Sequence, residues 1–557
     1  MSWIKNNINT ILIVIVICSM SIGGGYFVVS SFTVLIPLAL TYLLLIYTDK
    51  HIRVSVDVKF IAVVLMLGMY LVSSLWAVDS GTALMGVVKF SPVLLFMLVL
   101  YYSVDKEKII EIIPAAGFVM TVISVVMMQF DMFKPYVLVA GRLAGFYQYP
   151  NTYALLMLVC IIILSFDLKK SEKTDWISIV FLITACVGIY LSGSRIVFVL
   201  TIVYAVYFLA KNSRKTKIAV ISLSGIIVVS VVLSTLSNDG VMHLFSSNLS
   251  TLWGRLLYYM DALPYILKHP FGIGYMGYAF VQGEFQTGVY TVLNIHNELL
   301  QLMLDIGWIP AIVFYGAIIK SIFSKKLQKR DKLVITFIAL HSILDFDFQF
   351  ISILFILVLF LEDKEIKEYS ISGFSKVTAT IVTVGLLFIS FKVGVSEFFN
   401  VTRKYDKAIE MYSGNTMAKI NKLYNLDDDK EIEETARDIL NSNTKVSEAY
   451  SSLARVEFAK GNVEEYIANK DKALVLNPYE LEEYEEYVDV LCYCIDGYDS
   501  IGDDGSKKRC QEKIKEIPKV LKSVEERTSK LGWTIKDNPR VRLSSEQMEM
   551  IEEAVNK

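Results

Sequence analysis

Three side chains of the 557-residue sequence have the chemistry needed to bind a phosphate or to move a proton. Arg142 stands shortly before Pro150-Asn151, which predicts a helix start. An arginine together with free helix N–H groups suits a phosphate or pyrophosphate. Arg195 closes a tight Ser-Gly-Ser-Arg turn between apolar segments, where an unpaired charge near lipid would be costly. His296 stands at a predicted helix start, where a neutral imidazole could accept a hydroxyl proton.

Two of these residues also have a simpler interpretation. Arg142 could extend its guanidinium to lipid headgroups, and His296 could be a hydrogen-bonded helix cap. The segment 341–350 places His341, Asp345 and Asp347 close together, so the aspartates could orient a cation or hold the histidine. One histidine and two carboxylates resemble a metal set, but the spacing matches no standard metal site, and we expect no metal.

A long segment, 237–295, is rich in aromatic residues and glycine and is expected to be an ordered loop. Within it, residues 252–264 have the spacing of an amphipathic helix that lies on a membrane surface. Residues 269–278 form a glycine-rich aromatic turn of a kind that stacks on sugar rings. The candidate substrate-binding residues of the whole chain are Asn151, Asn297, Lys268, Tyr275, His341 and Asp345.

The elements that carry these residues are membrane helices followed by a soluble segment. The sequence is 54% hydrophobic and 20% charged, with a net charge of −2, which is too apolar for a soluble chain. The charge is uneven, because residues 1–396 are apolar and slightly basic, whereas residues 397–557 are densely charged and acidic. The balance gives no basis for nucleic-acid binding. We therefore predict a membrane domain over 1–396, with its external loop at 237–295, and a second domain over 397–557.

Thirteen apolar stretches, with an uncertainty of one or two, are candidates to cross the membrane. They lie near residues 9–23, 26–47, 60–78, 86–102, 109–129, 151–167, 176–192, 195–210, 218–236, 305–323, 333–345, 350–361 and 377–395. Most Lys and Arg residues of the membrane domain fall in short segments at alternate span ends. Because short cytoplasmic loops carry the excess of positive charge, we expect a cytoplasmic N-terminus and an extracytoplasmic C-terminal domain. Arg142, Arg195 and Arg255 then lie on the outer side.

The C-terminal domain contains one segment with the pattern of a tetratricopeptide repeat. Residues 447–478 place small residues, Ala454 and Ala473, where two helices of such a repeat pack closely, and Pro478 where the second helix stops. A repeat array needs about three units to bury a core, so degenerate repeats are expected on both sides. This domain could contact a ligand or a protein partner, or it could be a structural cap.

The motifs together resemble the O-antigen ligase and O-antigen polymerase family of bacterial membrane proteins. The resemblance covers roughly residues 9–361 and is carried by Arg142 with Pro150-Asn151, the Ser-Gly-Ser-Arg turn, Gly254-Arg255, His269-Pro270, His296-Asn297, and His341 with Asp345. It implies an all-α, polytopic, glycosyltransferase C-like membrane protein of about 12–13 spans. It also implies that the enzyme is metal-independent, needs no cofactor and inverts the transferred sugar.

The resemblance further implies substrates and residue roles. The donor would be a glycan on undecaprenyl pyrophosphate, and the acceptor a glycan or another hydroxyl, joined at the outer face of the cell membrane. Arg142, Arg195 and Arg255 would hold the pyrophosphate, and His296 would activate the acceptor. Two alternatives remain open, a protein O-oligosaccharyltransferase and a non-enzymatic flippase or transporter. A transporter is expected to show charges in the middle of its spans and two similar halves, and the sequence suggests neither.

Overall fold

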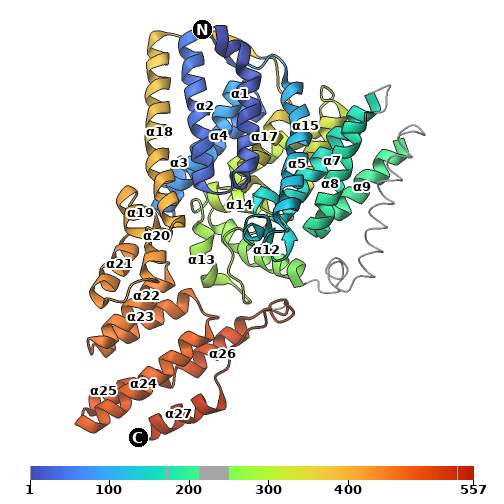
Figure 1. Cartoon of the computed structure of the whole chain (residues 1–557). Helices are drawn as coiled ribbons and strands as arrows, with labels where there is room; N and C mark the ends of the chain where they lie inside the picture. The colour runs from blue at the N-terminus through green and yellow to red at the C-terminus, as the bar shows by residue number, and fades with distance from the viewer. Residues whose placement is uncertain (1, 50, 171–174, 212–249, 536) are drawn as a thin grey trace. The chain divides into compact units, whose positions relative to one another are not determined.

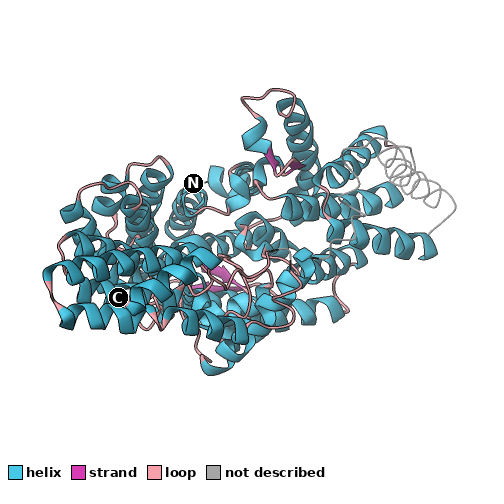
Figure 2. Ribbon diagram, turned by 90° about the horizontal axis from the view of Figure 1, so that it is seen from below, coloured by secondary structure: helices cyan, strands magenta, loops and turns pink. Residues whose placement is uncertain are grey.

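The protein is almost entirely helical in a computed structural model (Figure 1). The structure describes all residues except 1, 50, 171–174, 212–249 and 536. Within the described residues, strands form only two short antiparallel pairs, drawn in magenta in Figure 2. The all-α fold class expected from the sequence is confirmed.

The chain divides into two compact units. The membrane unit comprises Met1–Val72, Leu84–Ser247 and His296–Val395. The C-terminal unit comprises Ser73–Ala83, Asn248–Ile295 and Ser396–Lys557. The charge pattern predicts one membrane domain over 1–396, whereas in the structure residues 248–295 group with the C-terminal segment.

The membrane unit consists of helices joined by short turns. Its helices are α1 (Ser2–Ser21), α2 (Val28–Thr48), α3 (Val58–Ser73), most of α4 (Ser80–Leu100), α5 (Lys106–Met127), α6 (Lys134–Val137), α7 (Pro150–Lys170), α8 (Trp176–Ser192), α9 (Arg195–Lys211), α14 (Glu298–Ile306), α15 (Trp308–Phe323), α16 (Lys329–Ser342), α17 (Ile351–Phe360) and most of α18 (Gly373–Val401). Single 3₁₀ turns are η1 (Gly23–Gly25), η2 (Gly145–Tyr147) and η3 (Asp347–Gln349). The strands are β1 (His51–Val54), paired with β4 (Lys367–Ser370), and β2 (Leu138–Val139), paired with β3 (Arg142–Leu143).

The helices match the predicted spans. Among the described residues, α2, α4, α5, α7 and α18 are long and apolar enough to cross a membrane, and six shorter apolar helices lie in α1, α3, α8, α9, α15 and α17. The predicted span 333–345 coincides largely with α16, and the predicted span 218–236 lies outside the described residues. The chain is thus a polytopic α-helical membrane protein, and the number of crossings stays a prediction.

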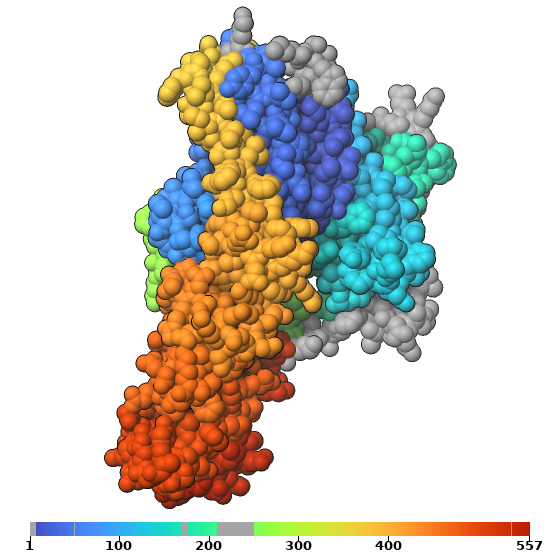
Figure 3. Space-filling view, turned by 60° about the vertical axis from the view of Figure 1, so that its left-hand side comes forward, coloured from blue at the N-terminus to red at the C-terminus, as the bar shows by residue number. Residues whose placement is uncertain are grey.

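Helix α17 forms the centre of the membrane unit. All ten of its residues are buried, and Phe355 stacks on Phe96 of α4 with ring centroids 4.2 Å apart. Helix α18 lies along α2, as the yellow and blue segments of Figure 3 show, and Tyr47 Oη and Thr380 Oγ1 are 2.9 Å apart. Long apolar runs form helices because neither the protein interior nor lipid offers hydrogen-bond partners. The backbone N–H and C=O groups must therefore pair within the helix.

The predicted cytoplasmic segments meet at one end of the membrane unit. Lys59 and Lys106 both pair with Asp363, the second at 2.8 Å, and Arg330 forms a bidentate pair with Glu107 at 2.7 and 3.0 Å. These contacts join four segments that the positive-inside pattern placed on the same side.

The site lies toward the other end of α1. The side chain of Asn9 accepts a hydrogen bond from Ser103 within the basic end of the unit. From Asn9, α1 rises about 1.5 Å per residue to η1, where a Cβ on Gly24 would clash with Tyr147 and Phe350. The predicted inner segments and the segments that carry Arg142 and Asp345 are therefore separated by roughly the length of α1.

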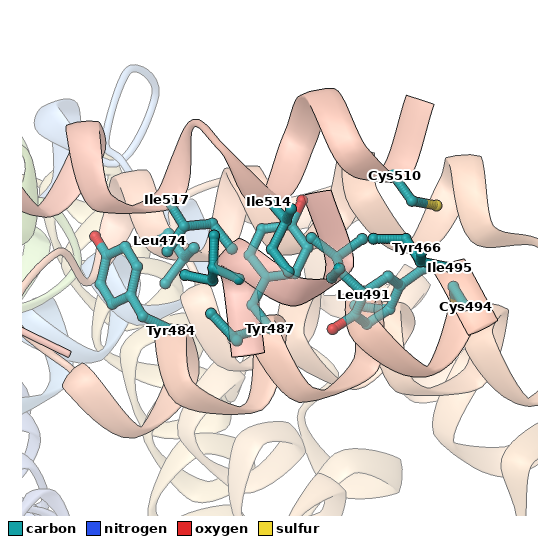
Figure 4. Close-up of a cluster of buried hydrophobic side chains, with 14 of the residues drawn as sticks. Tyr466, Leu474, Tyr484, Tyr487, Leu491, Cys494, Ile495, Cys510, Ile514 and Ile517 are labelled. Carbon is teal, nitrogen blue, oxygen red and sulfur yellow. The ribbon is translucent and has the colours of Figure 1, made fainter. Parts of the chain in front are cut away.

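The C-terminal unit contains helices α12 (Ser250–Lys268), α13 (Gly277–Phe285), α19 (Tyr405–Met411), α20 (Thr416–Leu423), α21 (Asp429–Ser442), α22 (Ser447–Ala459), α23 (Val463–Leu476), α24 (Leu481–Ile501), α25 (Asp504–Ile514), α26 (Ile517–Arg527) and α27 (Ser545–Asn556). The expected helix pair of residues 447–478 is α22 with α23, and Ala454 and Ala473 are buried. Figure 4 shows the adjoining apolar core, in which α24 contributes Tyr487 and Leu491. The assignment to the tetratricopeptide type stays a prediction.

Helix α12 covers the expected amphipathic segment 252–264. Its large apolar side chains Leu252, Trp253, Leu256 and Met260 are exposed, whereas Leu257 is buried. An exposed apolar face of this kind suits a helix that lies in a membrane interface.

Candidate active site

A tight hairpin positions Arg142. Strands β2 and β3 are joined by only two residues, Ala140 and Gly141, whose φ angles are +49° and +74°. Positive φ at both central residues is typical of a type I′ turn, the connection that best fits the twist of two paired strands. Arg142 follows the turn directly and pairs with Val139 across the ladder. The backbone of Arg142 is therefore fixed by the hairpin.

The guanidinium of Arg142 joins two other segments. Its Nε donates to the carbonyl of Ser192 and its Nη2 donates to Asn151 Oδ1, both at 2.7 Å. Gly193, which ends α8 with φ +58°, approaches so closely that a Cβ there would lie 3.4 Å from Arg142 Nε. The next helix, α9, begins at Arg195. The structure thus places the Ser192–Arg195 turn against the Arg142 side chain.

Asp345 is the centre of a hydrogen-bond network and is fully buried. Tyr149 Oη donates to its Oδ1 at 2.7 Å, and Asn151 Nδ2 donates to its Oδ2 at 2.8 Å. The backbone N–H of Phe346 also donates to Oδ1, at 3.0 Å. Asn151 therefore links the Arg142 guanidinium to the Asp345 carboxylate, and both oxygens of that carboxylate are occupied by donors.

His296 joins the same carboxylate. Its Nδ1 lies 3.2 Å from Asp345 Oδ1, and its side chain is 21% exposed. This contact is a hydrogen bond when Nδ1 carries the ring proton, and in that tautomer Nε2 carries the lone pair of the ring. The backbone of His296 has φ +54°, a conformation that non-glycine residues rarely adopt and that is often found at functional sites. The contact with Asp345 and the constrained backbone thus hold His296 in one orientation.

A second histidine and carboxylate lie beside this network and are wholly buried. His341 Nδ1 is 2.6 Å from Asp347 Oδ2, and Thr152 Oγ1 donates to Asp347 Oδ1 at 2.8 Å. The sequence left open whether the aspartates of segment 341–350 orient a cation or hold the histidine. In the structure, Asp347 holds His341. Asp347 is therefore held between Thr152 of α7 and His341 of α16, in the interior next to the network.

Comparison with known proteins bears on the same region. Residues 179–315 match the family model described as O-antigen ligase. This chain contains an O-antigen ligase domain. No curated protein matches the chain, and no solved structure matches it. The resemblance drawn from the sequence motifs is confirmed.

The O-antigen ligase domain contains part of the predicted site. The residues inside the matched segment are Arg195, Arg255, Lys268, Tyr275, His296 and Asn297. Arg142, Asn151, His341 and Asp345 lie outside it, and the hydrogen bonds above connect Asn151 and Asp345 to His296 within the membrane unit. The site described here therefore extends beyond the segment that defines the match.

Other predicted residues of the ligase domain have different surroundings. In the C-terminal unit, Arg255 is buried in α12, Lys268 is exposed at the end of that helix, and Tyr275 is buried. Asn297 is the N-cap of α14, and its Oδ1 accepts the N–H of Leu300 at 3.1 Å. This oxygen therefore completes a helix start within the chain.

Several polar residues of the site were not predicted from the sequence. Tyr149 and Thr152 donate to Asp345 and Asp347 from positions nearly 200 residues away in the chain. Glu298 accepts two backbone hydrogen bonds and is buried. No single residue signals them in the sequence, because an acidic residue in the first turn of a helix is common and the partners of Tyr149 and Thr152 lie far away in the chain.

Replacing Asp345 with asparagine is expected to lower kcat about 5- to 150-fold. One oxygen becomes an NH₂ group, so at least one of the donors from Tyr149, Asn151 and His296 loses its acceptor. A buried donor without a partner costs about 1–3 kcal/mol, and that cost sets the range. Steady-state kinetics of glycan transfer would measure it. The surface variant Asp105→Asn is the control, and equal rates for both variants would contradict the role of Asp345.

Proposed function

We propose that the protein transfers glycan from an undecaprenyl pyrophosphate donor to a hydroxyl acceptor at the outer face of the cell membrane. Glycan transfer of the O-antigen ligase or polymerase type follows from the family match. The donor, inversion of the transferred sugar, metal independence and the residue roles are our proposal. A glycan acceptor makes the enzyme a polymerase or a ligase, and the same site could serve either.

One observation carries the proposal: a single line of hydrogen bonds connects the proposed base to a proposed anion-binding group. His296 contacts Asp345 at 3.2 Å, Asp345 accepts from Asn151 at 2.8 Å, and Asn151 accepts from Arg142 at 2.7 Å. A base and a cation held in this way can act on the two ends of one displacement, the attacking hydroxyl and the departing pyrophosphate.

The proposed reaction is a single displacement. His296 Nε2 takes the proton of the acceptor hydroxyl as the oxygen bonds to the anomeric carbon. The bond from that carbon to the pyrophosphate breaks, and the pyrophosphate leaves with the electron pair. Arg142 and Arg195 stabilise the developing negative charge, an effect that preorganised donors supply strongly in a water-poor site. Attack from the opposite side inverts the anomeric centre.

The test uses purified protein in lipid nanodiscs with undecaprenyl-pyrophosphate glycan and an acceptor glycan. We expect release of undecaprenyl pyrophosphate together with a longer or transferred glycan. If Arg142→Ala, Arg195→Ala and His296→Ala all retain wild-type activity, the assignment of the site is wrong. An active enzyme with a peptide as its only acceptor would identify the protein O-oligosaccharyltransferase instead.

A transporter for the same lipid is the second candidate, and one residue favours it. Contrary to the expectation from the sequence, a charged residue lies in the middle of a span: Lys89 is buried in the middle of α4. It donates to Gln349 Oε1 at 3.1 Å and stands 4.7 Å from the Tyr26 ring centroid. Charged groups inside membrane helices often line transport paths. Movement of labelled donor across proteoliposomes without release of the carrier would support this function over glycan transfer.

The proposed sidedness gives a separate prediction. In a variant without native cysteines, Tyr424→Cys is expected to react with a membrane-impermeant maleimide in intact cells, because the C-terminal unit is outside. Lys367→Cys, in a predicted cytoplasmic segment, should react only after the membrane is permeabilised. Both positions are exposed, so access to the reagent differs only by the membrane. The reverse labelling pattern would overturn the proposed orientation.

A further inference from the structure

We infer that Glu298 is a positioning residue, whose carboxyl group fixes the His296 segment to the segment that carries Asp345. The inference rests on the proposed function, because it assigns Glu298 a part in holding the base of that reaction. Neither the sequence motifs nor the family match assigns it a role.

The carboxyl group of Glu298 connects two separate stretches of backbone. Its Oε1 accepts the N–H of Phe348 at 2.7 Å and the N–H of Gln349 at 3.2 Å. The side chain is fully buried, and it is the first residue of α14. One oxygen atom thus ties the start of α14 to η3.

Both ends of this connection are close to the reacting groups in the chain. His296 stands two residues before Glu298, and Asp345 stands three residues before Phe348. The 3.2 Å contact between His296 Nδ1 and Asp345 Oδ1 spans the same two segments. A shift of either segment would lengthen that contact, and a misplacement of about 1 Å can cost 10²-fold in rate.

The unusual backbone conformation of His296 must be imposed by the residues around it. Its φ of +54° costs energy and persists only where the surrounding structure imposes it. The Asn297 side chain caps α14, and the Glu298 side chain accepts two backbone hydrogen bonds from η3. The segment 296–298 is therefore held at each residue.

The surroundings of Glu298 disfavour its charged form. Burial, and next the nearby Asp347 carboxylate, raises the pKa of Glu298 well above its usual range. Within the described part of the chain, Glu298 Oε2 has no hydrogen-bond partner, so Oε1 is the oxygen that makes the connection. A glutamine has the same shape and retains the accepting Oε1.

The experiment compares Glu298→Gln, Glu298→Ala and the surface control Glu111→Ala in nanodiscs. We expect Glu298→Gln and Glu111→Ala to keep kcat within about threefold of wild type. We expect Glu298→Ala to lower kcat at least tenfold while the KM for undecaprenyl-pyrophosphate glycan changes less than threefold. Carbethoxylation of His296 by diethyl pyrocarbonate, followed by mass spectrometry, should be faster in Glu298→Ala, because the imidazole is less firmly held.

Several outcomes would overturn the inference. Wild-type kcat in Glu298→Ala would show that the contact does not position the base. Equal loss in Glu298→Gln and Glu298→Ala would show that the acid group itself is used in the reaction. A loss of kcat without a change in His296 modification would show a merely structural effect. Failure of the wild-type enzyme to transfer glycan would instead contradict the proposed function.

Discussion

Replacing His296 with alanine is expected to lower kcat about 10²- to 10⁴-fold, the range that general-base catalysis contributes. The substitution removes Nε2, the atom proposed to take the acceptor proton, and leaves the donor-binding arginines in place. The KM for the lipid-linked donor is therefore expected to change much less than kcat. Steady-state release of undecaprenyl pyrophosphate, measured over a range of donor concentrations, separates the two parameters.

His51→Ala is the control for this prediction. His51 is an exposed residue of β1, in the pair with β4, and it lies in a predicted cytoplasmic segment. It should retain wild-type kinetics. A His296→Ala variant that keeps more than a tenth of the wild-type kcat would show that the acceptor loses its proton to another group.

The positions of the helices could be predicted from the sequence, because the length of an apolar run is enough to predict a membrane helix. Runs of about 20 apolar residues have no stable alternative to a helix in lipid, so α2, α5 and α7 lie where the runs lie. The grouping of residues 248–295 with the C-terminal segment could not be predicted in this way. It depends on contacts such as that of Ser529 N with the Thr287 carbonyl, which join residues far apart in the chain.

The site could be predicted only in part, for a similar reason. Arg142 and Arg195 stand out because they fall on the predicted outer side, where positive charge is rare, and His296 stands out at a helix start. The residues that hold them do not stand out individually. Tyr149, Thr152 and Glu298 acquire their roles from partners brought close by folding, and a single sequence contains no record of those distances.

The fixed orientation of Arg142 leads to the second large effect. Arg142→Ala is expected to lower kcat about 10²- to 10³-fold, the loss seen when one preorganised donor to a developing negative charge is removed. Arg142→Lys restores the positive charge but not the two fixed donors of the guanidinium. An ammonium group cannot donate to both the Ser192 carbonyl and Asn151 Oδ1 with the geometry of Nε and Nη2. Its kcat should lie between those of wild type and Arg142→Ala.

Arg53→Ala is the matched control, because Arg53 is also an arginine of the membrane unit and pairs with Glu368 at 3.0 Å between β1 and β4. It should retain wild-type kinetics.

If Arg142 stabilises the departing pyrophosphate, Arg142→Ala should lose most rate with donors whose leaving group carries the most charge. A lipid monophosphate glycan, with less charge to stabilise, should then show a smaller ratio between wild type and variant than the pyrophosphate donor. Equal ratios for the two donors would assign Arg142 to holding Asn151 and Asp345 in place and would remove it from the leaving-group site.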